Sequence, residues 1–408
     1  MSRSVHNPWL HRFALLTAIT TLALIALGGL VTSHGVGMAV PDWPTTYGYN
    51  MFLFPVSKWV GGIFYEHTHR LVATVVGTLV VALTRWLGGR PACKPLLIIG
   101  LLEIVAGIAL PRWAPELKGT GYFLSGIGGV VVLAGAVWVR NEPAKRPLIQ
   151  WAWLAFGLVQ LQGLLGGLRV VLFKDELGIF HAALAQIFFV LLCAIALLTS
   201  RWWQNLPAKN AQPAATGYLR GLLLFTTALI FGQLLLGATM RHQHAGLAIP
   251  DFPLAYHKLW PPMDAASVMS YNQRRLEVID ANPITAFQIA LQMAHRLAAL
   301  LIFCAVIFCA WSTRRHWGRR HPLAKLSLAW LGLIALQVIL GAATIWSNKA
   351  ADIATAHVVV GALSLVTGAL LTIISFRVLM PVRVAVSPTT VSASVPVLSG
   401  KSASTSAK

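Results

Sequence analysis

Residues 66–83 read EHTHRLVATVVGTLVVAL, an apolar run of helix length that opens with one carboxylate and two histidines. Apolar runs of about 20 residues recur along the whole chain, which is typical of membrane-spanning helices. The chain is 57% hydrophobic and 11% charged, with a mean hydropathy of +0.70, whereas soluble domains carry about 25% charged residues. The first run, residues 13–30, lacks a small-residue cleavage site, so we expect a retained span. The sequence therefore predicts an all-α polytopic membrane protein.

About ten runs are long and apolar enough to span a bilayer. They cover residues 11–31, 62–84, 95–111, 122–139, 149–168, 178–199, 219–239, 284–310, 326–345 and 354–376. If the N-terminus is cytoplasmic, the cytoplasmic segments hold about twice as many Lys and Arg residues as the outer ones. We therefore expect a multi-pass protein of the cell (inner or plasma) membrane with both termini cytoplasmic.

The formal net charge of +20 follows from these loop cations and does not indicate nucleic-acid binding, because no basic stripe with interleaved aromatic residues is present. The four cysteines, Cys93, Cys193, Cys304 and Cys309, lie in or beside apolar runs without metal-ligand spacing. We expect them to be buried apolar residues that form neither a disulfide nor a thiolate metal site.

The two halves of the chain resemble each other. The segment AVPDWP at residues 39–44 has a partner, AIPDFP, at residues 248–253. His69-Arg70 matches His295-Arg296 in the span that follows. The repeated unit has four spans, so both halves run in the same direction, as parallel repeats do. We expect two repeated four-helix transmembrane bundles.

An inserted two-helix hairpin accounts for the difference in length between the halves. The interval from His69 to His181 is longer than the interval from His295 to His357, and the extra residues contain two of the expected spans. The predicted organisation has three parts: an N-terminal half at 1–200 with the hairpin at 92–145, a C-terminal half at 215–380, and a tail at 381–408. The tail is of low complexity and is expected to be disordered.

Four histidines occupy repeat-equivalent places near the outer ends of spans: His69, His181, His295 and His357. Ionisable groups inside a membrane are costly and usually functional. Two histidines from facing helices at equal depth can ligate one heme iron from both sides. We therefore predict two heme sites, one held by His69 with His181 and the other by His295 with His357. Zinc fits less well, because no carboxylate or cysteine completes a tetrahedral set in the second half.

Glycines accompany these sites: Gly28, Gly29, Gly166, Gly167, Gly237 and Gly341. They either let a flat porphyrin approach the backbone or serve ordinary helix packing. His67 points to a different helix face from His69 and is expected to be structural or exposed. Glu103 in the hairpin is expected to face a neighbouring helix or water.

Only the first site carries a carboxylate. Glu66 precedes His69 by one turn and shares its helix face, whereas Gln292 is its partner before His295. Glu66 is therefore a candidate catalytic residue that relays protons or stabilises positive charge, and the alternative is an ion pair with Arg70. Arg70 and Arg296 are candidates for holding heme propionates or for snorkelling to headgroups.

Together these motifs resemble the heme A synthase family of cytochrome oxidase assembly. The resemblance rests on Gly28-Gly29, Pro41-Asp42-Trp43-Pro44, Glu66-x-x-His69-Arg70, His181, His295-Arg296 and His357. It covers nearly the whole chain apart from the hairpin and the tail. Two departures are the hairpin, since the family usually has eight spans, and the lack of cysteine in residues 32–61, where some bacterial members carry a pair.

The resemblance implies an oxidoreductase that converts the C8 methyl of heme O to a formyl group, giving heme A. It implies that His69 and His181 bind heme O as substrate, that His295 and His357 hold a permanent heme b for electron transfer, and that Glu66 assists. Expected partners are heme O, heme A, membrane lipid, a heme O synthase and oxidase assembly factors. The main alternative is a non-catalytic diheme membrane cytochrome b. A heme chaperone or transporter is a third possibility.

Overall fold

The computed structural model describes all residues except 1–6, 138–142, 207–212, 275–282 and 379–408. Within the described residues, 10 helices are long and apolar enough to cross a membrane. They are α1 (Pro8–Ser33), α2 (Gly61–Gly88), α3 (Cys93–Trp113), α4 (Lys118–Ala136), α5 (Arg146–Leu172), α6 (Asp175–Thr199), α8 (Pro213–His242), α10 (Ala286–Trp317), α11 (Pro322–Trp346) and α12 (Ala351–Val378). The prediction of an all-helical, multi-pass membrane protein is confirmed.

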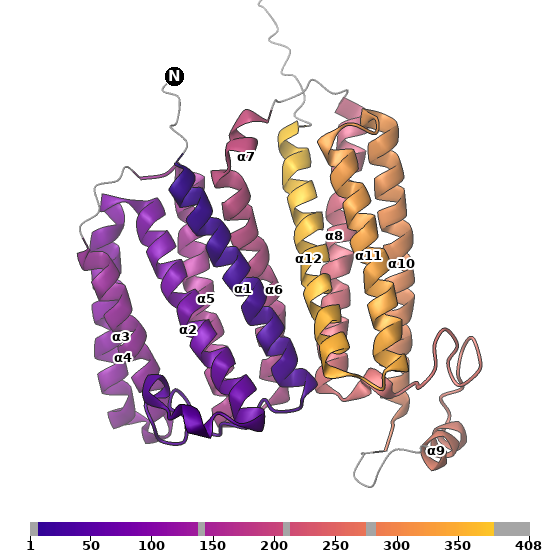
Figure 1. The fold of residues 1–408 in the computed structure, drawn as a ribbon, viewed down its shortest axis with the longest axis horizontal. Coiled ribbons are helices and arrows are strands. Elements are labelled where there is room, and N and C mark those ends of the chain that lie inside the picture. Colours follow the sequence, from indigo (N-terminus) through magenta and orange to yellow (C-terminus); the bar gives the residue numbers. More distant parts are fainter. Residues whose placement is uncertain (1–6, 138–142, 207–212, 275–282, 379–408) are drawn as a thin grey trace, which may run out of the picture.

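Two groups of four helices stand side by side (Figure 1). In the first group α1 packs on α2, α2 on α5, α5 on α6, and α6 on α1. In the second group α8, α10, α11 and α12 follow one another around the bundle in the same way. The helices α2 and α6 therefore stand diagonally across the first group, and α10 and α12 across the second.

The groups meet through α12, which packs on α1 and α6, and through α8, which packs on α6. This pattern of contacts is unchanged when the two groups exchange places, with α1 for α8 and α6 for α12. This symmetry of the helix contacts agrees with the duplication that the sequence predicts.

The inserted helices α3 and α4 pack closely on each other at one edge of the molecule (Figure 1). Glycines make this contact: a Cβ added at Gly100 would stand 2.7 Å from the carbonyl oxygen of Gly128. Small residues at such contacts let two backbones approach within the bilayer. The hairpin covers the outer side of α2 and α5, where Leu96, Val131 and Phe156 share a buried cluster.

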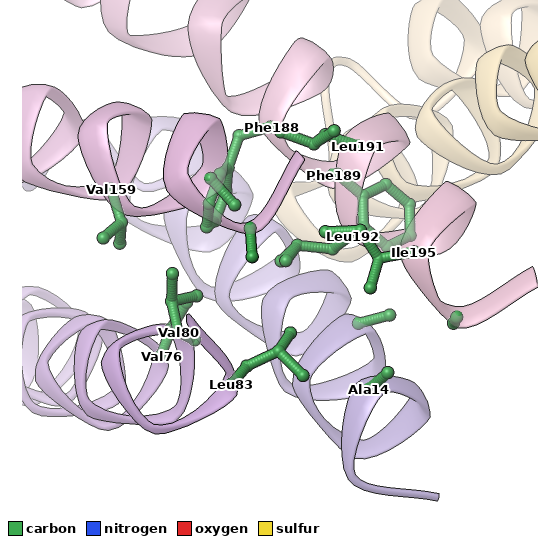
Figure 2. Packing of buried hydrophobic residues seen from close by; sticks show 14 of the residues in the cluster. Ala14, Val76, Val80, Leu83, Val159, Phe188, Phe189, Leu191, Leu192 and Ile195 are labelled. Carbon is green, nitrogen blue, oxygen red and sulfur yellow. The ribbon is translucent and has the colours of Figure 1, made fainter. Parts of the chain in front are cut away.

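The apolar cores lie in the end of each bundle away from the four histidines. Figure 2 shows the cluster of the first bundle, in which Val76 and Leu83 of α2 meet Phe188, Leu192 and others of α6. A second cluster joins α8, α10, α11 and α12 and includes the fully buried Trp330. Lipid tails are as apolar as these side chains, so close packing rather than the hydrophobic effect holds the helices together.

Two loops cover the histidine end of the bundles. Loop 1 (residues 34–60) joins α1 to α2, and loop 2 (residues 243–264) leads from α8 to the short helix α9 (Ala265–Gln273). A further short helix, α7 (Arg201–Asn205), follows α6. The first and last described residues lie at the opposite end from the loops (Figure 1). The tail that the sequence predicts to be disordered lies outside the described residues.

Candidate functional site

Each of the four histidines lies in the first turns of a helix that begins under the loops. His69 is on α2 and His181 on α6, which are diagonal in the first bundle; His295 on α10 and His357 on α12 are diagonal in the second. His69 lies within electrostatic range of His181, and His295 lies within electrostatic range of His357. The structure thus brings together the two pairs that the sequence spacing suggests.

Every one of these imidazoles lies against a glycine of the neighbouring helix. A Cβ added at Gly28 would stand 3.0 Å from Cε1 of His69. The same distance is 3.3 Å for Gly166 and His181, 3.4 Å for Gly237 and His295, and 3.3 Å for Gly341 and His357. These glycines therefore make room for the imidazole rings. This role differs from both roles considered from the sequence, namely close approach of a porphyrin and ordinary helix packing.

The second glycine of each pair has a different neighbour. A side chain at Gly29 would meet Thr355 of α12, and one at Gly167 would collide with the indole ring of Trp43. Gly29 therefore serves the contact between the two bundles, whereas Gly167 lets loop 1 approach α5.

The four imidazoles fit ligation by an iron porphyrin. The Nδ1 atoms of all four imidazoles are buried, and they make no hydrogen bond of good geometry within the described residues. The backbone groups of Leu24, Gln162 and Gln337 nevertheless lie close to His69, His181 and His357. Within those residues no three His, Cys, Asp or Glu side chains come together as a metal site. A heme iron needs only two axial ligands from the protein, since the porphyrin provides the other four.

Glu66 is buried, and both of its oxygen atoms are engaged. Arg70 donates from Nη2 to Oε1 at 2.7 Å, and the backbone amide of Val40 in loop 1 donates to Oε2 at 2.9 Å. The ion pair with Arg70, which the sequence left as an alternative, is therefore present in the structure. A carboxylate held in this way ties the start of α2 to loop 1.

Gln292 occupies the matching place in the second bundle. Its Oε1 accepts from the backbone amide of Ile249 at 2.7 Å, and its Nε2 donates to the carbonyl oxygen of Ile249 at 3.3 Å. Glu66 and Gln292 thus bind the same point of their two loops, and they differ in charge rather than in position.

Arg70 and Arg296 bind loop carbonyl groups. Arg70 donates to the carbonyl oxygens of Asp42 (2.6 Å), Thr45 (3.0 Å) and Val40 (2.8 Å). Arg296 donates to those of Leu254 (2.8 Å) and Asp251 (2.7 Å). These contacts differ from both sequence-based roles, propionate binding and snorkelling, because the guanidinium groups face the loops that fold back over the bundle.

The loops share one turn geometry. Asp42 accepts hydrogen bonds from the amides of Tyr47 (2.7 Å) and Gly48 (2.8 Å) and from Thr45 Oγ1 (2.5 Å). Asp251 accepts in the same way from the amides of Tyr256 and His257. Partial burial raises the pKa of Asp42, but the hydrogen bonds from Gly48, Thr45 and Tyr47 outweigh it and leave this pKa below its usual value.

Three cations near the histidines had no signal in the sequence that set them apart. Arg169, on the last turn of α5, lies within electrostatic range of both His69 and His181. Arg241, on the last turn of α8, acts on His357 and lies close to Lys349. Arg241 also donates to the carbonyl oxygen of Gly29 (2.9 Å) and to Ser33 Oγ, so it crosses from the second bundle to α1.

The remaining polar residues singled out from the sequence lie outside these pairs. His67 is buried beneath loop 1, where Thr46 Oγ1 lies 3.0 Å from its Nδ1 and where Phe54 packs on its ring. Its structural role is therefore confirmed. Glu103 accepts from Gln160 of α5 at 2.6 Å and so faces a neighbouring helix, as expected.

Known proteins resemble this chain across much of its length. The profile of the COX15-CtaA family, described as cytochrome oxidase assembly protein, matches residues 123–369. The heme A synthase of Symbiobacterium thermophilum is 31% identical over 247 residues, which cover 58% of this chain and 72% of that protein. The heme A synthase of Shouchella clausii is 23% identical over 345 residues, or 84% of this chain and 88% of that protein.

The profile covers more than half of the chain and includes three of the four histidines, and the longer alignment extends the similarity to most of the remainder. The chain therefore belongs to the COX15-CtaA family of cytochrome oxidase assembly proteins.

Proposed function

We propose that this chain is a heme A synthase, an oxidoreductase that converts heme O to heme A. The observation that carries the proposal is the pair of diagonal histidine sets, each imidazole seated on a glycine, in a chain similar to several heme A synthases. A bound heme supplies redox chemistry at its iron, and the protein supplies ligands, orientation and local charge.

The two histidine pairs are proposed to have different roles. His69 and His181 bind heme O as substrate, and His295 and His357 hold the heme b that serves electron transfer. Support comes from the charged groups around the first pair, where Glu66 and Arg70 form an ion pair while the second pair has Gln292 in place of the acid.

Glu66 is proposed to serve the first site as a carboxylate. Its ion pair with Arg70 sets the charge beside His69, and its bond to Val40 N keeps loop 1 over the site. General acid–base assistance by a positioned carboxylate contributes about 100-fold or more to a rate. The amide at Gln292 makes the matching loop contact without the charge, so the two halves provide an internal comparison.

The protein is proposed to lie in the cell (inner or plasma) membrane with the histidine end outside and both termini cytoplasmic. The excess of Lys and Arg at the end away from the loops supports this orientation. Heme O synthase and oxidase assembly factors are the proposed protein partners.

Pigment analysis tests the proposal. Co-expression with a heme O synthase is expected to yield heme A on extraction of the membranes. Recovery of heme B alone, with heme O unconverted, would instead indicate the rival function, a diheme membrane cytochrome b that only carries electrons.

A further inference from the structure

The second and third helices of each bundle leave a groove between them at the end away from the histidines. In the first bundle a cavity of about 270 Å³ lies where α3 and the turn before it meet α5, and its lining includes Gly88, the last residue of α2, and Trp153 of α5. In the second bundle a cavity of about 430 Å³ lies between α10 and α11, and its lining includes Arg314 of α10 and Leu328 of α11. The offset that pairs His69 with His295 pairs Gly88 with Arg314.

The offset that pairs Gly166 with Gly341 likewise pairs Trp153 with Leu328. Two lining residues of the first cavity therefore have repeat-equivalent residues in the lining of the second.

In the first bundle the hairpin covers this side of α2 and α5. Pro95 and Ile99 of α3 line the cavity beside α5. The hairpin is fixed there by polar contacts as well, since Arg85 Nη2 of α2 donates to the carbonyl oxygen of Val137, just after α4, at 2.9 Å. Among the residues that the structure describes, no charged side chain lines this cavity.

The second groove has no hairpin over it in the described part of the chain, and cations rim it instead. Arg314, Arg315 and Arg319 lie around its mouth, while its walls include the apolar side chains of Ile307 and Leu331. These cations have no carboxylate nearby in sequence, since no Asp or Glu occurs between Asp280 and Asp352. In the described residues the one ion pair is that of Arg70 with Glu66.

The side chain of Trp311 is part of the lining of this groove. The guanidinium of Arg315 lies 5.1 Å from the centre of the Trp311 ring. Tryptophan is enriched at the level of the lipid headgroups. The groove thus combines apolar walls with three arginines beside a tryptophan of the kind found near lipid headgroups.

We propose that this groove binds one anionic phospholipid, which covers α10 and α11 as the hairpin covers α2 and α5. The phosphate lies among Arg314, Arg315 and Arg319, and an acyl chain lies along Ile307 and Leu331. Basic pockets between membrane-spanning helices are known to hold anionic headgroups. A transmembrane helix of a partner or of a second copy fits less well, because it would have to leave the three cations without counter-charges.

The test is lipid retention by the purified full-length protein. The protein is exchanged from bilayers of phosphatidylcholine doped with phosphatidylglycerol into detergent, and the retained lipid per chain is measured by mass spectrometry. We expect about one phosphatidylglycerol per native chain. Replacing all three arginines by glutamine is expected to weaken retention on the order of 100-fold, since each interfacial cation contributes about fivefold. Replacing them by lysine is expected to preserve it.

A matched control removes three cations from the same end of the first bundle: Lys94, Lys145 and Arg146, each changed to Gln. This control is expected to retain lipid as the native chain does. Leu328→Trp, which fills the groove without changing charge, is expected to reduce retention and to show that the apolar wall takes part.

Four results would overturn the proposal: equal retention by the triple glutamine variant, equal loss in the control, a preference for phosphatidylcholine, or a change of oligomeric state in place of lipid loss. Displacement of the lipid by soluble glycerol phosphate, with no effect of Leu328→Trp, would show an anion site without a lipid chain and would also count against it.

Discussion

His69 of α2 packs against Gly28 of α1 so closely that a Cβ at Gly28 would stand 3.0 Å from Cε1 of the imidazole. Three further histidines face a glycine of the preceding helix of their bundle in the same way, at 3.3 to 3.4 Å. A glycine at these four places leaves room for the ring that it faces. A larger side chain at each place therefore provides a way to disturb one proposed site at a time.

Gly237→Leu is expected to displace His295 and to remove most of the heme held by the second pair, because the new side chain occupies the space of the imidazole ring. The heme-to-protein ratio and the reduced-minus-oxidised spectrum measure this loss. Gly232→Leu on the same helix is the control, since a Cβ there would meet nothing within 4 Å. An equal loss of heme in both variants would show a general effect on α8.

Glu66→Gln is expected to leave both hemes bound, because an amide oxygen can still accept from Val40 N, as Gln292 accepts from Ile249 N. Formation of heme A is expected to fall by about 100-fold with loss of the carboxylate. Extracted pigments measure the output. Unchanged heme A would assign Glu66 the same loop-holding task as Gln292 and no part in the chemistry.

Loop 1 is expected to loosen in acid through Asp42. The pKa of this carboxyl is lower in the folded protein than its ordinary value of 3.8, so its stabilising effect is complete well above pH 4 and is lost as the pH falls through the folded-state pKa. The charge-assisted bonds from Tyr47 and Gly48 are expected to contribute on the order of 1 kcal/mol after discounting for solvent.

Limited proteolysis of loop 1 as a function of pH measures this effect. Asp42→Asn is expected to be cleaved faster at neutral pH and to show little further change in acid. A native loop whose cleavage rate stays constant down to pH 3 would contradict the assignment.

Arg241→Gln is expected to lower the midpoint potential of the heme held by His295 and His357 by roughly tens of millivolts. A shift of this order is typical when a neighbouring positive charge is removed. The positive charge of Arg241 acts on His357 and favours the more electron-rich state. Redox titration measures the shift. Arg220→Gln, at the far end of the same helix, serves as the control, and an equal shift there would remove the specific role of Arg241.

The ten spans and the placing of the four histidines on facing helices could be predicted because both depend on local pattern, namely apolar runs of fixed length and a motif that occurs twice. The contacts of Arg70 and Arg296 with the two loops could not be predicted. Arg70 and Arg296 follow histidines in the sequence, which suggested a role toward the ligand. Apart from the ion pair of Arg70 with Glu66, their partners are backbone carbonyl groups more than twenty positions away. Carbonyl groups carry no sequence signal, so only the folded loop reveals them.

The hairpin, too, could be predicted only in part from the sequence. Its two spans and their place in the topology followed from length and hydropathy, whereas its docking on α2 and α5 depends on Gln160 and Phe156, which look like ordinary span residues in the sequence. Arg169 and Arg241 were also missed, because each ends its helix, where a cation is common in any membrane protein.

The central claim is that opposite imidazoles on diagonal helices share an iron in each bundle. Low-spin heme signals of the purified protein, recorded for His295→Ala, His357→Ala, His69→Ala and His181→Ala, test it most directly. The account predicts that the first two variants each abolish the same signal and that the last two leave it intact. A signal that survives in both His295→Ala and His357→Ala would contradict the account.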